Sequence, residues 1–352
     1  MNKKLLFLFF VIMISSLIME SFIYAREPRE EGKSKDTSIE LQKFTGQPRS
    51  TLLNINALAQ WWRADGRLSH DSRTGSSGVF FPRGLGTGAA VIFADGFVWG
   101  GLVRDGRTPE LRAGGNTFNV GLIEGAILPG GVAEDPAAPD VRIWRIRRDY
   151  ATADLALDAE ELELDVATVR AQYGTDWREW PWQKGAPWTG IDNKLDGGYL
   201  GPDGETIMGA GNGVLDRGED ANSNAILDGG EDANGNGVLD GEVPGIVGAD
   251  QVVWTVANDL TLGLTTGFLG APPIGLEVQI TGFGFNQTGA LGHMVFKQEK
   301  IIYKGTATTP PFARIDSMFV AQWVDPDLGS FSDDFVGVDT TLSLGFVYNS
   351  SS

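Results

Sequence analysis

Residues 216–242 read DRGEDANSNAILDGGEDANGNGVLDGE and repeat one pattern every twelve residues. Carboxylate and amide side chains recur at loop positions 1, 3, 5, 9 and 12, which is the ligand spacing of a calcium-binding loop. Calcium is a hard cation that takes six to eight oxygens at about 2.3–2.6 Å, and oxygens two residues apart in a curled loop converge on one point. The stretch therefore predicts that Ca²⁺ is bound here.

The three copies of the loop differ in completeness. The middle copy fills every position, with a backbone carbonyl expected at position 7. The third copy has Val243 at position 12 and a carboxylate one residue earlier, and the first copy lacks its first two ligands. The predicted ligands are Asp220, Asn222, Asn224, Ile226, Asp228 and Glu231 in the middle copy, Asp232, Asn234, Asn236, Val238, Asp240 and Glu242 in the third, and Asn212, Asp216 and Glu219 as weaker candidates in the first.

An acidic flexible linker is the alternative interpretation of the same stretch. Residues 216–242 carry eight carboxylates against one Arg217, and such a run stays disordered unless a cation neutralises it. A linker does not need Asn, Asp and a Val/Ile-Leu pair in twelve-residue register, so we favour calcium binding.

The loops are contiguous, because Glu231 ends one and Asp232 begins the next. No residues remain for the flanking helices of an EF-hand. The arrangement resembles the stacked calcium loops of thrombospondin type 3 repeats, and also the loops of dockerin modules, which need helices between them. The first resemblance implies ion-dependent rigidity, and the second implies an assembly module.

Composition excludes several functional classes. The 352 residues carry a formal net charge of −18, which argues against nucleic acid as a partner. The absence of cysteine excludes disulfides, thiol catalysis and cysteine-ligated zinc. No P-loop, Rossmann fingerprint, HExxH or G-x-S-x-G motif is recognisable, so we expect a role other than catalysis.

Residues 1–25 have the pattern of a signal peptide. Lys3 and Lys4 precede an apolar run, and cleavage is expected after Ala25. The alternative is an uncleaved membrane anchor, but the run is short for a bilayer span. We expect a secreted, extracellular or cell-surface protein with no membrane span in the mature chain.

The remaining chain alternates short apolar runs with glycine turns, which is typical of antiparallel β-structure. We predict a mainly β, sandwich-like fold with an inserted calcium-loop repeat and one short helix. That helix is expected from Asp165, as N-cap, to about Tyr173, with Gly174 ending it. A hairpin is expected around Asp95-Gly96, and another around Gly114-Gly115. The expected organisation is a signal peptide at 1–25, a disordered lead at 26–53, a β-rich domain at 54–190, the acidic insert at 191–248 and a β-sandwich-like region at 249–352.

Two clusters of side chains leave alternatives open. Trp177, Trp180, Trp182 and Trp188 just precede the insert, where they either stack on sugar rings or, as we favour, pack its junction with the β-structure. Arg142, Arg145, Arg147 and Arg148 follow a half-buried strand pattern, where they either bind an anion or, as we favour, form a solvated face paired with local carboxylates.

A second acidic cluster lies in a loop between the last two expected strands. It holds Asp325, Asp327, Asp333, Asp334 and Asp339. We rank a structural acidic loop first, a further calcium site second and paired carboxylates for glycoside hydrolysis third. His70 and His293 are interpreted as ordinary surface histidines.

A wider resemblance rests on four stretches. They are VRIWRIRRDYATADL at 141–155, DWREWPWQKGAPW at 176–188, PPIGLEVQ at 272–279 and DPDLGSFSDDFVGVDTTLSLGFVYN at 325–349. These stretches resemble the N-terminal region of large bacterial secreted proteins that often carry a C-terminal sorting domain of the type IX secretion system. That family usually has one short calcium-like loop after GAPW, where this chain has an expanded set. The resemblance implies export and no particular activity.

The favoured function is that of a secreted or cell-surface structural or adhesive protein with calcium-stabilised tandem loops. One alternative is a carbohydrate-binding module or a non-catalytic part of a secreted glycan-degrading protein. Another is a dockerin-like assembly module. The expected partners are calcium ions, with glycans or cell-surface proteins as candidates.

Overall fold

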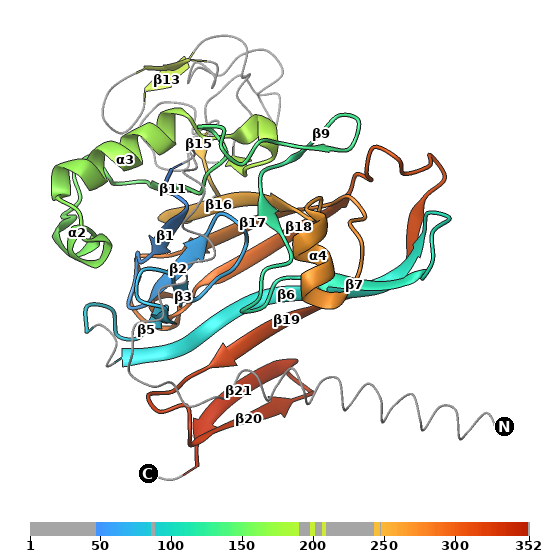
Figure 1. Ribbon diagram of the computed structural model, residues 1–352. Helices are drawn as coiled ribbons and strands as arrows, with labels where there is room; N and C mark the ends of the chain where they lie inside the picture. Colours follow the sequence, from blue (N-terminus) through green and yellow to red (C-terminus); the bar gives the residue numbers. More distant parts are fainter. Residues whose placement is uncertain are drawn as a thin grey trace, which may run out of the picture. The chain divides into compact units, whose positions relative to one another are not determined.

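The computed structural model describes residues 47–85, 89–189, 198–200, 206–208, 243–246 and 248–350. The fold is mainly β with antiparallel sheets, as predicted (Figure 1). The expected signal peptide, most of the expected lead and the calcium-loop repeat lie outside the described residues.

The first sheet has six strands in the order β1-β2-β5-β6-β19, with β7 also paired to β6. It begins earlier than predicted, because Leu52 and Leu53 of the expected disordered lead are buried in a strand. Its two longest strands, β6 and β19, run side by side (Figure 1). The strands are β1 (Ser50–Leu53), β2 (Ala59–Arg63), β5 (Val79–Phe80), β6 (Ala90–Arg104), β7 (Leu111–Gly115) and β19 (Arg314–Pro326).

The second sheet has five strands in the order β11-β16-β17-β18, with β8 also paired to β16. Its central strand β16 is buried along its whole length, which requires cover on both faces. The strands are β8 (Ile123–Glu124), β11 (Trp144–Arg147), β16 (Gln251–Asn258), β17 (Leu276–Gly284) and β18 (Phe296–Tyr303).

Two apolar cores follow from the alternation of side chains along β16. Val253 and Ala257 belong to a core shared with Trp62 and Phe97 of the first sheet. Trp254, in the same strand, belongs to a second core that includes residues of helix α3. The second sheet is therefore a middle layer between the first sheet and α3, which is the layered packing that buries both of its faces.

Three α-helices occur in the described part of the chain, where one was expected: α2 (Ala156–Leu162), α3 (Val166–Arg178) and α4 (Leu262–Leu269). The predicted N-cap of α3 is confirmed, because Asp165 accepts a hydrogen bond from Thr168 N at 2.8 Å. The predicted end at Gly174 is wrong, because the helix continues and buries Trp177. Packing of that indole favours one more helical turn over a glycine stop.

The hairpin predicted at Asp95-Gly96 is also wrong, because both residues lie inside β6. They pair with Val324 and Trp323 of β19. The Asp95 carboxylate accepts hydrogen bonds from Gln60, Lys297 and Gln322, so this Asp is held in the sheet by distant partners. The second predicted hairpin fails similarly, because Gly114 and Gly115 form part of β7.

Short ladders complete the described chain, together with two 3-10 helices. The segments on either side of the insert share both sheets, since β11 pairs with β16 and β6 pairs with β19. The ladders are β3 (His70–Asp71) with β4 (Ser76–Ser77), β9 (Ile127–Leu128) with β10 (Val132–Ala133), β12 (Trp188–Thr189) with β15 (Val243–Pro244), β13 (Gly198–Leu200) with β14 (Thr206–Met208), and β20 (Asp334–Asp339) with β21 (Leu344–Asn349); the 3-10 helices are η2 (Trp182–Lys184) and η3 (Ala290–His293).

Candidate functional site

The acidic insert leaves and re-enters the β-structure at one point. Thr189 pairs with Val243 and Trp188 with Pro244 in the β12–β15 ladder, and Gly245 N donates to Pro187 O at 3.0 Å. The two ends of the insert are thus held side by side by backbone hydrogen bonds. The predicted calcium ligands from Asn212 to Glu242 lie outside the described residues.

The tryptophans beside this ladder pack the junction, so the favoured interpretation is confirmed. Trp177 and Trp180 are 3% and 2% exposed, and Trp180 Nε1 donates to Pro187 O at 2.7 Å. Trp182 and Trp188 are half-buried against the same core, with ring centroids 6.1 Å apart. The buried rings of Trp177 and Trp180 offer no face to a sugar.

Arg142, just before β11, and Arg145 and Arg147 within it are buried, so the predicted solvated face is wrong for these three; Arg148 is exposed as predicted. Arg142 donates to Asp176 at 2.6 Å, and the Arg145 guanidinium lies 4.3 Å from the Tyr173 ring centroid. The predicted pairing with local carboxylates is confirmed by Arg147, whose Nε donates to Asp149 Oδ1 at 2.6 Å. Burial raises the pKa of Asp176 to about 6, even though Arg142 opposes this shift. The three buried arginines are engaged inside the protein and do not form an anion-binding face.

A buried hydrogen-bond network links α3 to the sheets. The Tyr173 hydroxyl donates to Asp158 Oδ2 at 2.9 Å and accepts from Gln251 Nε2 at 2.7 Å. Gln251 Nε2 also donates to Asn54 Oδ1 at 3.0 Å, and Arg83 Nη2 donates to Asp158 Oδ1 at 3.0 Å. Burial raises the pKa of Tyr173. The network joins the helical layer to the sheets, and all of its members except Arg83 are buried, which suits a structural role.

The second acidic cluster forms the connection between β19 and β20, and not a loop alone. Asp325 lies in β19, whereas Asp334 and Asp339 lie in β20. Asp327 N donates to Val91 O at 3.1 Å, and Asp334 Oδ2 accepts from Leu328 N at 3.0 Å. Throughout the described residues, no group of three or more His, Cys, Asp or Glu side chains is arranged to hold a metal ion.

Electrostatics in this connection centre on Asp327. Its pKa is raised to about 6, first by burial and then by the negative charges of Asp325 and Asp334. Asp333 Oδ1 and Asp334 Oδ1 are buried and have no hydrogen-bond partner among the described residues. Several carboxylates therefore lie close together where the β20–β21 hairpin begins. This arrangement agrees with the structural acidic loop that we ranked first.

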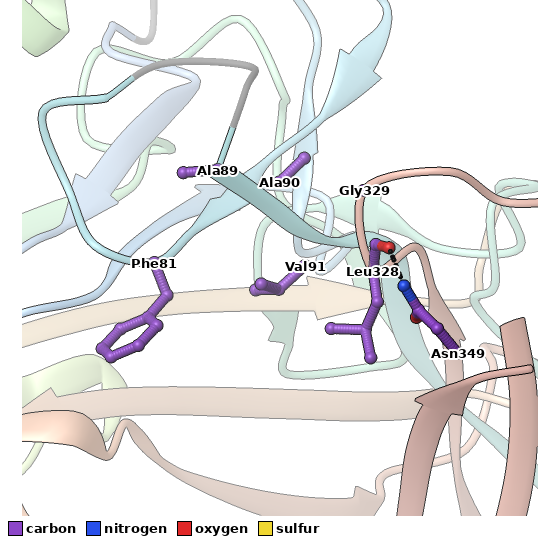
Figure 2. A pocket seen from close by; sticks show the side chains of 7 residues that line it. All are labelled: Phe81, Ala89, Ala90, Val91, Leu328, Gly329 and Asn349. Carbon is purple, nitrogen blue, oxygen red and sulfur yellow. Dashed lines mark hydrogen bonds between the residues drawn. The ribbon is translucent and has the colours of Figure 1, made fainter. Parts of the chain in front are cut away.

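A hollow of about 370 Å³ adjoins this connection (Figure 2). Phe81 and residues 89–91 form one wall, and Leu328, Gly329 and Asn349 form the other. Figure 2 shows the Asn349 side chain donating to Leu328 O, a distance of 3.3 Å. The lining side chains are apolar apart from Asn349 and none of them is titratable, so the hollow offers no acid or base for hydrolysis.

Exposed apolar side chains are numerous in the C-terminal region, and the sequence analysis missed them. Among the most exposed of them are Phe319 at 76%, Val336 at 75% and Phe331 at 74%. The available signal was the hairpin 334–349, which is apolar at successive positions and therefore on both faces. These exposed side chains are Phe312, Phe319, Val320, Val324, Phe331, Phe335, Val336, Val338, Leu342, Leu344, Phe346 and Tyr348.

The histidines differ in environment. His293 is exposed, as expected, and its ring lies 5.4 Å from that of Phe81. His70 is half-buried, with its ring against the edges of Phe93 and Phe118 at 5.1 and 5.2 Å. Burial and the nearby Arg63 and Arg67 lower the pKa of His70 to about 4. His70 is therefore a neutral member of an aromatic cluster, and the surface prediction is wrong for it.

Comparison with family models, with curated proteins and with solved structures finds no match to this chain. The resemblance to type IX secretion substrates therefore stays a prediction. Within the ranges that the structure describes, no helix has both the length and the apolar character needed to cross a bilayer.

Proposed function

We propose that this chain is a secreted or cell-surface structural or adhesive protein whose insert, residues 191–248, is rigidified by Ca²⁺. The observation that carries the proposal is the twelve-residue register of oxygen ligands in residues 212–242. Support comes from the base of the insert, where the β12–β15 ladder and the buried side chain of Trp180 hold the two ends of the insert together. An insert that Ca²⁺ makes rigid, and that is held at its base by the β12–β15 ladder, would project from the β-structure in a fixed direction. This property suits adhesion better than catalysis.

A non-catalytic role is also favoured by the acidic cluster at Asp325–Asp334. Hydrolysis by paired carboxylates needs an acid and a base that face a substrate cleft. Here the adjacent hollow has no titratable side chain in its lining, and Asp334 Oδ2 accepts a hydrogen bond from the backbone of Leu328. The carbohydrate-binding alternative retains only the half-buried Trp182 and Trp188, which already contact each other and the core.

Calcium titration by calorimetry tests the proposal. In the full chain we expect saturable binding with dissociation constants of roughly 10⁻⁴–10⁻³ M, as in extracellular modules. Replacing Asp220 and Glu231 by Ala should remove the strongest site because it deletes positions 1 and 12 of the middle loop. A matched control replaces Asp203 and Glu205 by Ala, which changes the net charge equally outside the repeat and should leave binding intact.

Limited proteolysis in calcium and in chelator provides the structural readout. Calcium should suppress cleavage between Ile191 and Gly248 in the parent chain and in the control variant, but less in the Asp220→Ala, Glu231→Ala variant. Absence of binding heat, together with identical cleavage in chelator, would instead mean that the repeat is an acidic linker. A calcium-dependent protein captured through the loops would favour the dockerin-like alternative.

A further inference from the structure

The amine of Lys297 lies between two carboxylates where the two large sheets face each other. Its Nζ is 3.3 Å from Asp95 Oδ1 and 3.1 Å from Glu299 Oε1. The side chains of Lys297, Asp95 and Glu299 are only 18%, 7% and 15% exposed. Asp95 belongs to β6 of the first sheet, whereas Lys297 and Glu299 belong to β18 of the second. One amine therefore meets a carboxyl group from each sheet.

The carboxyl group of Asp95 is held in one orientation by hydrogen-bond donors on both oxygens. Oδ2 accepts from Gln60 Nε2 at 3.1 Å and from the Ser69 hydroxyl, and Oδ1 accepts from Gln322 Nε2 at 3.1 Å. Ser69 is fully buried with a φ of 61°, a backbone conformation that costs free energy outside glycine, so the fold fixes this hydroxyl against Asp95. Two fixed donors on Oδ2 can stabilise negative charge that develops there if a nucleophile attacks Asp95 Cγ.

Lys184 provides a comparison because it also lies between two carboxylates. Its Nζ is 2.7 Å from both Glu134 Oε1 and Asp140 Oδ2, but the side chain of Asp140 is 58% exposed. Asp95 is far better shielded from water. Condensation of an amine with a carboxylic acid releases water, and exclusion of bulk water protects the product from hydrolysis. The setting of Lys297 therefore suits a condensation, whereas that of Lys184 suits an ordinary ion pair.

We propose that Lys297 and Asp95 condense to an intramolecular isopeptide bond that joins β18 to β6, with Glu299 carrying protons between the reacting atoms. The chain has no cysteine, so this bond would supply the covalent link that disulfides supply in many secreted proteins. The reacting groups lie outside the insert, so the bond should form with or without calcium.

The reaction balances without a further reagent. The Lys297 ammonium passes one proton to Asp95 Oδ1, which leaves a neutral amine beside a neutral carboxylic acid. Nζ then attacks Asp95 Cγ while Glu299 takes a second proton from the nitrogen, and Gln60 and Ser69 stabilise the negative charge on Oδ2. Glu299 returns its proton to the hydroxyl group at Oδ1, the C–O bond breaks and one water molecule leaves. Fixed proximity makes this a unimolecular step, which lowers its entropic barrier.

Mass spectrometry of the full chain tests the bond. After allowance for processing at the N-terminus, we expect a mass lower than the sequence requires by one water molecule, and a branched tryptic peptide in which Lys297 is joined to Asp95. Lys297→Arg keeps the positive charge but removes the amine, so it should have the full mass and two separate peptides. The matched control Lys184→Arg makes the same change between the other two carboxylates and should keep the branched peptide.

Two further variants test the roles of the carboxyl groups. Asp95→Asn should still form the bond, with loss of one ammonia molecule in place of water, because the amide nitrogen becomes the leaving group. Glu299→Gln keeps the shape of the side chain but removes the proton carrier. It should slow formation of the branched peptide in newly synthesised chain by about 10²–10⁴-fold.

The Asp95-Gly96 pair can also lose water by closing a succinimide ring on its own backbone. That loss would persist in Lys297→Arg and would give no branched peptide. Circular dichroism establishes that each variant is folded. A parent chain with its full sequence mass, a loss of water that survives Lys297→Arg, or a folded Asp95→Asn chain without a branched peptide would overturn the proposal. Each of these results is independent of calcium binding by the insert.

Discussion

At the scale of single residues, Tyr173 shows how the core depends on specific hydrogen bonds. Its hydroxyl joins Asp158 and Gln251 at a buried position. Tyr173→Phe removes that hydroxyl and deletes one buried hydrogen bond from each partner, one of them to a carboxylate, so we expect a loss of about 1–3 kcal/mol in the free energy of unfolding. Urea denaturation measures this loss. The same deletion at half-exposed Tyr348 should change the free energy little, and equal effects at both sites would contradict the role of the network.

Asp327 gives the residue-scale prediction for pH. Its folded pKa of about 6 lies above the ordinary value of 3.8, so between roughly pH 4 and 6 the folded state binds more protons than the unfolded state. The free energy of unfolding should therefore fall as pH rises through this window, and the penalty should be complete above about pH 6. Asp327→Asn removes the charge that Asp325 and Asp334 oppose.

We expect Asp327→Asn to stabilise the protein by about 1 kcal/mol at pH 7 after allowance for partial solvent exposure, and to have little effect at pH 4. Urea unfolding of both chains at the two pH values measures the difference. Asp339→Asn, at the end of β20, removes the same charge outside this group of carboxylates and is the control for the change in net charge. A stabilisation of equal size at pH 4 would rule out titration of Asp327 as the cause.

At the scale of elements, the tryptophans at the base of the insert are predicted to stabilise the fold and not to contact a ligand. Trp180 is 2% exposed and packs with α3 and β16 residues in one core. Trp180→Ala should lower the free energy of unfolding by about 3–5 kcal/mol because it leaves a large cavity. Phe331→Ala, which removes a ring that is 74% exposed, is the comparison and should cost far less. A Trp180→Ala chain that keeps its stability but loses glycan binding would favour the carbohydrate-binding alternative.

At the scale of the whole molecule, the insert is predicted to be separable from the β-structure. Thr189 and Val243 are antiparallel partners, so an Asn-Gly pair in place of residues 190–242 can close a two-residue hairpin between them. We expect this chain to fold, to keep a melting temperature within a few degrees of the parent and to lose calcium binding. Thermal unfolding and calorimetry check both points.

A Gly/Ser segment of the same length as residues 190–242 is the control for the Asn-Gly chain. Loop closure costs about 0.6 kcal/mol for each doubling of length, so the control should be less stable by about 2–3 kcal/mol and should be cut by protease even in calcium. Failure of the Asn-Gly chain to fold would instead make the insert part of the core.

Part of the site was predictable because its signals are local. The Asp165 N-cap depends on a side chain and an amide three residues apart, and the packing of the tryptophans was anticipated from their place beside the insert. The prediction of a hairpin at Asp95-Gly96 was wrong because the local turn signal was outweighed by hydrogen-bond partners of Asp95 more than 200 residues away, including Lys297 and Gln322. The burial of Arg145 was missed for the same reason, since its cover is supplied by Tyr173.

The sequence by itself determined the mainly β class and the place of the insert, because strand periodicity, turn composition and a twelve-residue repeat act over a few neighbouring residues. Only the tertiary structure decided that strands on both sides of the insert share two sheets and that β6 runs straight through Asp95-Gly96 to pair with β19. Those outcomes depend on which distant strands pair and which faces they cover. The free energy of burial comes from contacts between layers that are far apart in the sequence, so local patterns do not determine it.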